Sequence, residues 1–552
     1  MPDQDDAPVA DGDPDPMAAV MALLAPGAPF EMGTEKVLGV PLQVFVQRAG
    51  SLRELLTSST RFGDVDYAVF HDGDRRRAVT FTEHERRVAS VAAALADRGI
   101  GPTDRVAILA ANCPEWLETF WAVVSLGAIA VACNGWWTRD EVEHALAHTR
   151  PVLLVADRKR LARLEGADPG MPVVVIEDDF VALQEFSPDA ALPNVAIDED
   201  QPALLQFTSG TTGSPKGAML RHSAICRAFL AWSEVIGLEA GDRYLVVNPF
   251  FHAFGLNSGI LACLMKGVTL VPHPVFDVPA VMRRVGEERI TMLPGPPAIY
   301  QTILNHPDLD EFDLSSLRLA VTGAATIPVQ MIHAMRDRLG FDKVVTGYGL
   351  TEASGIATMC RHDDDPALIA GTSGRAIDDV EVRVVTPDGA ECPAGQPGEV
   401  VVRGYNVMVG YLDDPDQTAE AIDAEGWLHT GDIGVMDADG YLDITDRVKD
   451  MFINGGFNVY PAEVERLMLA HPEVGQVAVV GIPDDRLGEV GMAFVVPAPD
   501  THPDPADIVS WCRDEMANYK APRRVEVIDV LPLNASGKVL KFELRQRGAA
   551  LL

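Results

Sequence analysis

A short loop rich in glycine and hydroxyl side chains carries the strongest chemical signal in the chain. It spans 207–217 and reads FTSGTTGSPKG. Glycines let the backbone approach phosphate oxygens, hydroxyl groups donate hydrogen bonds to those oxygens, and a lysine adds positive charge. The loop therefore predicts a polyphosphate site, and hence ATP chemistry, built from Thr208, Ser209, Gly210, Thr211, Thr212, Gly213 and Lys216.

The loop differs from the Walker pattern, which ends in Gly-Lys-[Ser/Thr]. Here Lys216 follows Pro215 and precedes Gly217. An ordinary surface loop rich in Ser, Thr and Gly is the alternative interpretation. The polyphosphate interpretation therefore depends on the other motifs of the chain.

The segment GYGLTE, which ends at Glu352, also has the residue types of a nucleotide site. Its two glycines permit a tight backbone beneath a flat base. Thr351 can donate to a phosphate, and Glu352 can bind Mg²⁺, which prefers carboxylate and phosphate oxygens. The alternative is a strand-to-loop turn with an exposed glutamate. The candidates for nucleotide and metal binding in this segment are Gly347, Tyr348, Gly349, Thr351 and Glu352.

Three further side chains suit a nucleotide and its reaction. Asp432, in the sequence TGD, can accept hydrogen bonds from both ribose hydroxyls, and Arg447 can donate to the same sugar. Lys538, in LNASGKVLK, is a cation of the kind that neutralises charge developing during attack on the α-phosphorus. The alternatives are a turn-forming aspartate and solvated basic side chains.

Apolar runs alternate with helical patterns along most of the chain, and these elements must position the motifs. A capping-box pattern, Thr82 with Glu85, predicts the start of a helix that ends near Gly99. Strand-like runs lie at 105–110, 128–132, 152–156, 268–271, 290–293, 317–321 and 344–346. The alternation predicts an α/β fold with parallel layers, in which sites lie at the strand ends.

The pattern changes after Glu399, where shorter β-like runs follow one another. A charged connector, DRVKD at 446–450, then precedes a compact unit. That unit predicts a small α+β domain with helices at 462–469 and 506–516 and strands at 475–480, 492–496 and 525–530. The predicted division is an acidic disordered tail at 1–16, a large N-terminal domain at 17–446 with layered α/β subdomains and a β-rich part, and a C-terminal domain at 447–552.

Composition limits the function classes. The 552 residues carry a formal net charge of −36, which argues against nonspecific nucleic-acid binding, because nucleic-acid phosphates need a basic surface. A polyanionic ligand must therefore be held by local cations or a metal. Seven cysteines without a CxxC pair indicate neither a disulfide framework nor a zinc site. The acidic N-terminus and the shortness of the longest apolar run, 120–133, favour a cytoplasmic protein without a transmembrane segment.

Taken together and in order, the motifs resemble those of the adenylate-forming superfamily of acyl-CoA synthetases, adenylation domains and luciferases. The resemblance covers nearly the whole chain. It is carried by 208-TSGTTGSPKG-217, 249-PFFHAFG-255, 323-GAA-325, 347-GYGLTE-352, 398-GEVVVRG-404, 430-TGD-432, 446-DRVKDMFINGGFNVYPAEVE-465 and 534-NASGK-538.

The resemblance implies a reaction in two halves with ATP, Mg²⁺ and coenzyme A. A carboxylate attacks ATP to give an acyl-adenylate and pyrophosphate, and a thiol then displaces AMP. In such enzymes the small C-terminal domain is mobile and swings about a hinge, here near Lys449. Thr346 stands where relatives often carry Asn.

The resemblance also assigns roles to individual residues. Thr351 and Glu352 would contact the α-phosphate and Mg²⁺, Lys216 would hold the β- and γ-phosphates, and Lys538 would be the main catalytic cation. The segment Gly323, Ala324 and Ala325 would lie against adenine. The segment with Gly455, Gly456 and Phe457 would line the pantetheine tunnel.

The acid is indicated by the segment PFFHAFG. His252 matches the position that gates the acyl pocket in acyl- and aryl-CoA ligases, whereas amino-acid adenylation domains generally place an aspartate there. The resemblance therefore disfavours an amino acid and favours a medium- or long-chain fatty acid or a steroid-derived acid. The predicted pocket walls are His252, Phe254, Gly255, Thr322, Gly323, Tyr348 and Leu350.

Other functions stay open at this stage. An acyl-AMP ligase that loads a carrier protein and a luciferase-like oxygenase share the same motifs, and a nonenzymatic nucleotide sensor is a third alternative. The expected partners are a small carboxylic acid, ATP and coenzyme A, with no nucleic acid. A homodimer is open as the oligomeric state.

Overall fold

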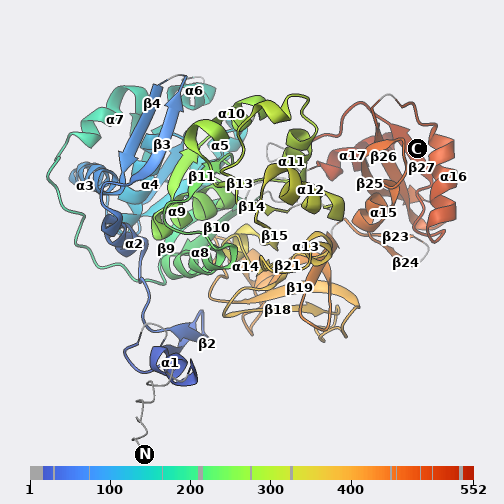
Figure 1. Cartoon of the computed structure of the whole chain (residues 1–552), viewed down its shortest axis with the longest axis horizontal. Helices are drawn as coiled ribbons and strands as arrows, with labels where there is room; N and C mark the ends of the chain where they lie inside the picture. Colours follow the sequence, from blue (N-terminus) through green and yellow to red (C-terminus); the bar gives the residue numbers. More distant parts are fainter. Residues whose placement is uncertain are drawn as a thin grey trace, which may run out of the picture.

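The computed structural model describes residues 16–28, 31–73, 75–164, 166–208, 216–273, 277–323, 327–447, 450–454, 457–484, 486–499, 501–533 and 539–551. Figure 1 shows a large body of packed helices and sheets, with a smaller unit at the C-terminal end set to one side. A short N-terminal unit, made of α1 (Pro16–Leu23) and the hairpin β1 (Met32–Val37) and β2 (Val40–Phe45), projects below the body.

Two large sheets form the body. One has seven strands in the order β20, β10, β9, β6, β5, β7, β8, with bounds Gly410–Tyr411, Lys216–Arg221, Pro202–Thr208, Ile129–Ala132, Arg105–Leu109, Leu153–Ala156 and Val173–Val175. The other has nine in the order β17, β16, β15, β14, β13, β11, β12, β3, β4, with bounds Arg375–Ala376, Thr358–Met359, Lys343–Tyr348, Leu319–Thr322, Met292–Pro294, Arg243–Val246, Thr269–Pro272, Asp66–Asp72 and Arg75–Thr80.

The central strands of both sheets pair in parallel. They are almost wholly apolar and buried, as in β7 and β14, which is expected when helices cover both faces of a parallel sheet. The predicted strands at 105–110, 128–132, 152–156, 268–271, 290–293, 317–321 and 344–346 are confirmed as β5, β6, β7, β12, β13, β14 and β15.

The helices of the body lie between and outside the sheets. Their bounds are α2 Leu52–Ser59, α3 Phe81–Asp97, α4 Pro114–Ser125, α5 Arg139–Thr149, α6 Arg158–Leu161, α7 Ile176–Gln184, α8 His222–Ile236, α9 Ala262–Lys266, α10 Val278–Glu288, α11 Pro297–Leu304, α12 Val329–Leu339, α13 Pro366–Gly371 and α14 Pro415–Ala421. Helix α4 is buried from Trp116 to Ser125, because it is apolar on nearly all sides and belongs to the largest core.

One predicted helix start is wrong. The expected capping residue was Thr82, but α3 begins at Phe81 and its cap is Thr80, whose side chain accepts from the backbone N–H of Glu83. Both threonines have a glutamate three residues later, so the capping-box spacing alone does not distinguish them. Burial of Phe81 in the core favours the earlier start.

The β-rich part and the C-terminal unit follow the body in the chain. An antiparallel sheet joins β18 (Val380–Val385), β19 (Pro397–Gly404), β21 (Leu428–Met436) and β22 (Leu442–Arg447). In its described residues the C-terminal unit has a five-stranded sheet and three helices, and its predicted elements are confirmed. Its elements are β23 Phe452–Asn454, β24 Phe457–Val459, α15 Pro461–Met468, β25 Val474–Asp484, β26 Gly488–Pro497, α16 Pro505–Glu515, β27 Arg524–Val527 and α17 Lys541–Ala550.

The fold is thus α/β, with a large N-terminal part and a small α+β C-terminal part. The predicted tail at 1–16 lies outside the described residues except for Pro16, at which α1 begins. No helix in the described ranges is both long and apolar enough to cross a bilayer.

Candidate active site

The buried carboxylate of Asp432, on β21, contacts one side chain of β22 and one at the end of β15. Asp432 and Arg447 face each other in the register of β21 and β22, and the Arg447 Nε lies 2.9 Å from Asp432 Oδ1. The Tyr348 hydroxyl donates to Asp432 Oδ2 at 2.6 Å. Burial, and then the charge of Asp432, raise the pKa of Tyr348 well above its usual value. The tyrosine therefore stays a hydrogen-bond donor, and three predicted nucleotide-binding residues meet at one carboxylate.

A second cluster surrounds Glu352. The Tyr411 hydroxyl donates to Glu352 Oε1 at 2.9 Å, and burial, followed by the charge of Glu352, raises the pKa of Tyr411. The Lys216 ammonium lies 5.1 Å from the centroid of the Tyr411 ring and donates to the side-chain oxygen of Gln417. Cation, ring and carboxylate therefore form one connected group.

Backbone pairing explains why these side chains meet. Strand β20 pairs with β10 through Ala218 and Tyr411, and the Leu412 N–H donates to the Gly217 carbonyl at 2.9 Å. The Met408 N–H donates to the Glu352 carbonyl at 2.8 Å. Sequence reasoning missed Tyr411 and Gln417, since Gln417 is 201 residues from Lys216 and no local pattern links the two.

Two antiparallel strands flank the predicted phosphate loop, whose residues 209–215 lie outside the described residues. Thr208 ends β9 and Lys216 begins β10, and the two residues are partners in the antiparallel register. This pairing therefore places the two described ends of the predicted loop side by side, and the Lys216 side chain reaches the Glu352 cluster.

The predicted adenine-binding segments are also neighbours. Gly323 follows β14, and a Cβ atom there would lie 3.2 Å from the Gly347 carbonyl oxygen. A Cβ on Gly349 would lie 2.3 Å from the Gly355 carbonyl oxygen, so this position requires glycine. Thr351 and Glu352 follow directly in a 3-10 turn, Thr351–Ala353. The candidates for base binding (Gly349) and for phosphate and metal binding (Thr351 and Glu352) therefore lie on one tight turn.

Thr346 has a structural role. Its side chain is buried, and its hydroxyl lies 3.0 Å from the Thr372 carbonyl oxygen and 3.1 Å from that of Ile369. These contacts hold β15 against the end of α13. The Thr346 hydroxyl is therefore used by backbone carbonyls. The side chain of β15 that contacts Asp432 is Tyr348.

His252 lies on the loop after β11. Asn112 fixes the loop from both sides: its Nδ2 donates to the Asn248 carbonyl at 2.9 Å, and its Oδ1 accepts from the Phe250 N–H at 2.7 Å. The side chain of His252 is exposed, and its Nδ1 accepts from the Phe254 N–H at 3.2 Å. Its Nδ1 is therefore an acceptor in this arrangement, and its ring orientation is defined.

The His252 loop leads into a π-helix, η3 (Phe254–Leu261), a geometry that often occurs at functional sites. A Cβ on Gly255 would lie 2.0 Å from the Pro249 carbonyl oxygen, so only glycine fits. Asn257 in this helix donates to the Ser354 carbonyl at 3.1 Å. This bond ties the predicted acyl-pocket segment to the turn that carries Thr351 and Glu352.

A buried contact joins the β-rich part to the C-terminal unit. Asp446 Oδ2 accepts from the Ala462 N–H at 2.8 Å and so caps the first turn of α15. Burial raises the pKa of Asp446 to about 6. Within the C-terminal unit, Lys541 pairs with Glu465 at 2.8 Å, and Arg545 pairs with Asp450 at 2.9 Å.

Several predicted site residues lie outside the described residues. These are Ser209, Gly210, Thr211, Thr212, Gly213, Ala324, Ala325, Lys449, Gly455, Gly456 and Lys538. Phe457 is described by its backbone, as the first residue of β24.

The donor set around Glu352 fits a metal held jointly with substrate. In the part of the chain that the structure describes, no group of three or more His, Cys, Asp or Glu side chains is arranged to hold a metal ion. Mg²⁺ is usually bound by one or two carboxylates together with substrate phosphates. One carboxylate, Glu352, with a lysine nearby suits that mode.

Comparison with known proteins identifies the class. The AMP-binding enzyme family matches residues 57–412, and the AMP-binding enzyme C-terminal domain matches 463–538. The chain belongs to the family of AMP-binding enzymes. Among solved structures it is similar to ATP-bound MatB from Rhodopseudomonas palustris, with a TM-score of 0.82 and 29% identity, covering 90% of this chain and 99% of MatB.

Two curated relatives narrow the class further. Both are named 3-[(3aS,4S,7aS)-7a-methyl-1,5-dioxo-octahydro-1H-inden-4-yl]propanoyl:CoA ligase. The protein from Rhodococcus jostii (strain RHA1) is 44% identical over 89% of this chain and 97% of its own length. That from Mycobacterium tuberculosis (strain ATCC 25618 / H37Rv) is 46% identical over 88% and 96%. The chain is an AMP-forming acyl-CoA ligase, which activates a carboxylic acid through an acyl-adenylate.

Proposed function

We propose that the acid activated by this ligase is a steroid-derived propanoate with a bulky, fused-ring body. The observation that carries the proposal is that the two relatives named for such an acid share 44% and 46% identity with nearly the whole chain. A medium- or long-chain fatty acid is the second candidate, since its apolar body and single carboxylate make the same demands on the pocket walls.

The residues around the predicted acyl pocket suit a rigid apolar acid. His252 and Phe254 flank the start of η3, where Phe254 packs edge-on against Trp232 with ring centroids 6.4 Å apart. Fixed aromatic side chains favour a ligand of defined shape, because little side-chain entropy is lost on binding.

We assign the nucleotide to the Asp432 and Glu352 clusters. A carboxylate has lone pairs beyond those used by Tyr348 and Arg447, so Asp432 can accept from ribose hydroxyls while those donors orient it. Tyr411 holds Oε1 of Glu352 and leaves Oε2 for the metal. When bound, Mg²⁺ supplies charge neutralisation at the phosphates.

The two lysines have separate tasks in this proposal. Lys216 binds the pyrophosphate leaving group, because it begins the strand after the phosphate loop and is held by Gln417 and Tyr411. Lys538 neutralises charge at the α-phosphorus during adenylate formation. The segment with Gly455, Gly456 and Phe457 then lines the path of the coenzyme A thiol, which displaces AMP.

A carboxylic-acid panel tests the substrate. AMP release that depends on coenzyme A should have its highest kcat/KM with a hydrindane propanoate, lower values with medium- and long-chain fatty acids, and none with amino acids. Turnover with benzoates or amino acids alone would refute the substrate proposal while leaving the ligase class intact.

The proposal extends to the domain division and the cellular location. We propose a division into domains at 17–446 and 447–552 with the hinge near Lys449, which is supported by the separate cores of the C-terminal sheet. A cytoplasmic location is supported by the seven cysteines, all present as free thiols. Limited proteolysis that cuts near Lys449, and fractionation of the producing cells, test these two properties.

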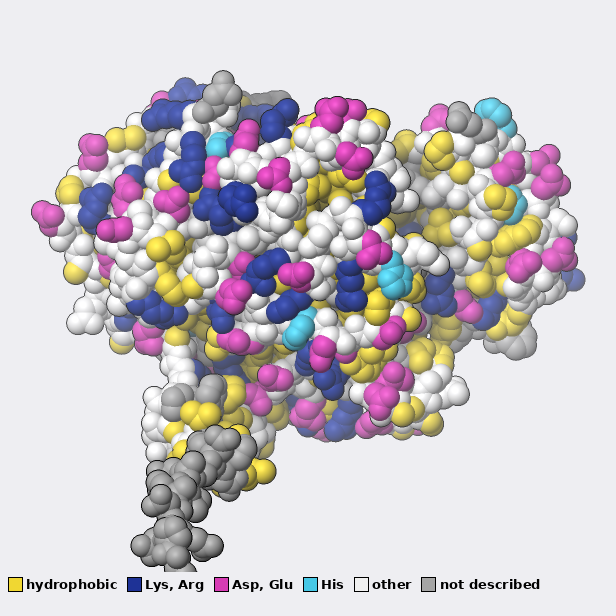
Figure 2. Space-filling view, viewed as in Figure 1, with side chains coloured by type: hydrophobic (Ala, Val, Ile, Leu, Met, Phe, Trp, Pro, Cys, Tyr) yellow, Lys and Arg dark blue, Asp and Glu magenta, His cyan; other side chains and the backbone are white. Residues whose placement is uncertain are grey.

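A homodimer is proposed from the N-terminal unit. Helix α1 exposes 67% of Met17, 50% of Val20 and 62% of Met21. Figure 2 shows hydrophobic side chains gathered on this projection. Light scattering after gel filtration should give twice the chain mass, and a chain without residues 1–45 should give the monomer mass. A monomeric full-length chain would refute the proposal.

A further inference from the structure

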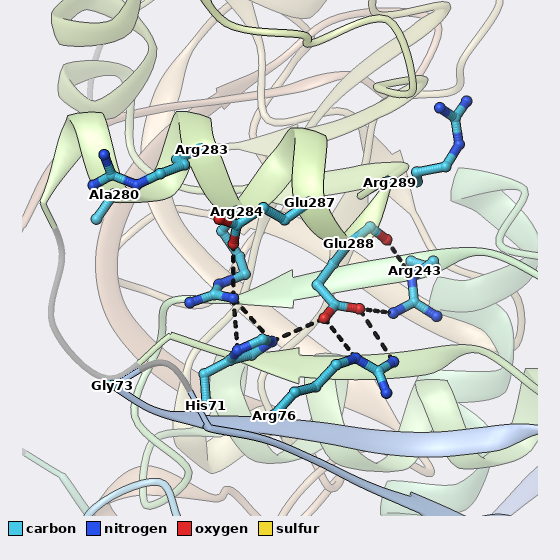
Figure 3. Close-up of a pocket in the computed structure, with 10 residues that line it drawn as sticks. All are labelled: His71, Gly73, Arg76, Arg243, Ala280, Arg283, Arg284, Glu287, Glu288 and Arg289. Atoms are coloured by element: carbon cyan, nitrogen blue, oxygen red, sulfur yellow. Dashed lines mark hydrogen bonds and ion pairs between the residues drawn. The ribbon is translucent and has the colours of Figure 1, made fainter.

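A second concave site lies on the nine-stranded sheet, apart from the nucleotide and acyl motifs. It is a cavity of about 800 Å³ between α10 and the strands β3, β4 and β11. Figure 3 shows the residues that line it, and Figure 2 shows Lys and Arg side chains gathered on the same part of the surface. We call it the arginine pocket; it is lined by His71, Gly73, Arg76, Arg243, Ala280, Arg283, Arg284, Glu287, Glu288 and Arg289.

Two arginines of the pocket, Arg76 and Arg243, pair with the buried carboxylate of Glu288. Glu288 accepts from Arg76 Nε at 2.8 Å and lies 2.9 Å from His71 Nε2, while Arg243 donates to its other oxygen. Burial alone would raise the pKa of Glu288, but the hydrogen bonds from Arg76 and His71 outweigh it and lower the pKa. These contacts hold the guanidinium groups of Arg76 and Arg243 against Glu288.

The other three arginines of the pocket, Arg283, Arg284 and Arg289, have other surroundings. Arg284 Nη1 lies 2.7 Å from His71 Nδ1 and 2.9 Å from Glu287. Since a guanidinium can only donate, Arg284 donates to the His71 ring, which also lies beside Glu288. In Figure 3 no interaction joins Arg283 or Arg289 to the other residues drawn, and both side chains are exposed.

The charge of the arginine pocket is opposite to that of the molecule. Five arginines meet two glutamates there, an excess of three positive charges, in a chain whose formal net charge is −36. Arg289 also acts on Asp313 outside the pocket, where Ser315 is the main cause of a lowered pKa and Arg289 the last. A concave surface with an excess of positive charge concentrates negatively charged ligands.

The geometry points to phosphate as the recognised group: we propose that the arginine pocket binds a small molecule carrying two or more phosphoryl groups. The planar guanidinium fork matches phosphate oxygens in pairs. A cavity of about 800 Å³ lies in the size range of small-molecule sites. Long polyanions such as nucleic acids are disfavoured, because the rest of the surface repels them.

Equilibrium titration of the full-length chain with inorganic pyrophosphate and, separately, with adenosine diphosphate tests the proposal. Both ligands should occupy two sites, one at Lys216 and one in the arginine pocket. The charge reversal Arg283→Glu/Arg289→Glu should remove the second site or weaken it about tenfold or more, and Lys216→Ala should weaken the first. These two arginines hold no buried carboxylate, so the variant should keep the fold.

The controls separate local binding from net charge and from folding. Arg86→Glu/Arg513→Glu makes the same change in charge at exposed arginines of α3 and α16 and should keep both sites. If the charge reversal unfolds the chain, Arg283→Gln/Arg289→Gln is titrated instead and should show the same loss in milder form.

The outcomes differ by ligand source. Loss of the second site for both ligands supports recognition of the phosphoryl groups themselves, and loss for adenosine diphosphate alone supports a nucleotide ligand. A single site in the wild type, or two sites of unchanged affinity in both pocket variants, overturns the proposal. Neither result bears on the ligase activity, which the acid panel measures.

Discussion

At the scale of single residues, Tyr411 connects the carboxylate of Glu352 with the ammonium of Lys216. It donates to Glu352 at 2.9 Å and presents its ring to Lys216 at 5.1 Å. A hydrogen bond to a charged group contributes about 1.5–3 kcal/mol. The phenol therefore orients the proposed metal ligand and the proposed phosphate anchor together.

Replacing Tyr411 by Phe should lower kcat/KM for adenylate formation about 10- to 100-fold and raise the Mg²⁺ concentration needed for half-maximal rate, because Glu352 loses its donor. Pyrophosphate exchange measured over a range of Mg²⁺ concentrations checks both effects. Tyr441→Phe is the matched control, since that hydroxyl donates to Asp364 at 2.7 Å in another part of the molecule. An unchanged Mg²⁺ dependence in Tyr411→Phe would contradict the role.

At the scale of elements, the start of the π-helix η3 requires a glycine at position 255. A Cβ at Gly255 would lie 2.0 Å from the Pro249 carbonyl oxygen, which no side-chain movement can relieve because the clash is with backbone. The loop that carries His252 would have to shift. Stability and acid binding should therefore both respond to this position.

Gly255→Ala should cost about 2 kcal/mol or more of unfolding free energy and raise KM for the acid. Urea denaturation and steady-state kinetics measure the two effects. Gly101→Ala is the control, because a Cβ there has no neighbour within 4 Å. Equal urea-denaturation midpoints for Gly255→Ala and Gly101→Ala would show that the backbone clash is relieved with little loss of stability.

The joint between β22 and α15 is also an element-scale feature, and it depends on pH. Burial raises the pKa of Asp446 to about 6 from the usual 3.8, so the folded protein binds this proton more tightly than the unfolded chain does. The carboxyl's contribution to stability is therefore largest below about pH 4 and falls as the pH rises to about 6.

Asp446→Asn keeps an oxygen that accepts from the Ala462 N–H but removes the titration. The unfolding free energy of the wild type should fall relative to that of Asp446→Asn as the pH rises from about 4 to about 6, and the difference should then level off. Urea unfolding at each pH measures it. Parallel curves for the two proteins would contradict the raised pKa, and Asp416→Asn, at an exposed position of α14, provides the baseline.

The sequence predicted elements and local motifs better than long-range contacts. Strands such as β7 and β14 were predictable because unbroken apolar runs are typical of buried parallel strands. Asp432 and Arg447 were predictable because they lie in motifs. Tyr411 and Gln417 were not, because their roles arise from the pairing of β10 with β20, which joins distant parts of the chain. The wrong cap at Thr82 came from two equivalent patterns that only burial distinguishes.

At the scale of the whole molecule, we expect the two half-reactions to be separable by mutation if the C-terminal unit moves as proposed. The C-terminal unit has its own sheet and cores, and it meets the large part through Asp446 and its neighbours. A unit of this kind can change its orientation as one body. Residues of the small unit that serve one half-reaction then need not serve the other.

Lys538→Ala should slow adenylate formation about 100-fold or more while sparing thioester formation from supplied acyl-AMP, because its ammonium is assigned to the α-phosphorus alone. Pyrophosphate release and thioester formation are measured separately. Lys36→Ala, at an exposed position in the N-terminal hairpin, is the control. Equal loss of both half-reactions would refute the assignment.

The cluster of Lys216, Glu352 and Tyr411 has an evolutionary consequence. One phenol contacts both the carboxylate and the ammonium, so we expect substitutions at the three positions to be coupled. The three positions should therefore be inherited as a unit: among homologous sequences, loss of the tyrosine at 411 should coincide with substitution at 216 or 352, even where the surrounding segments diverge freely.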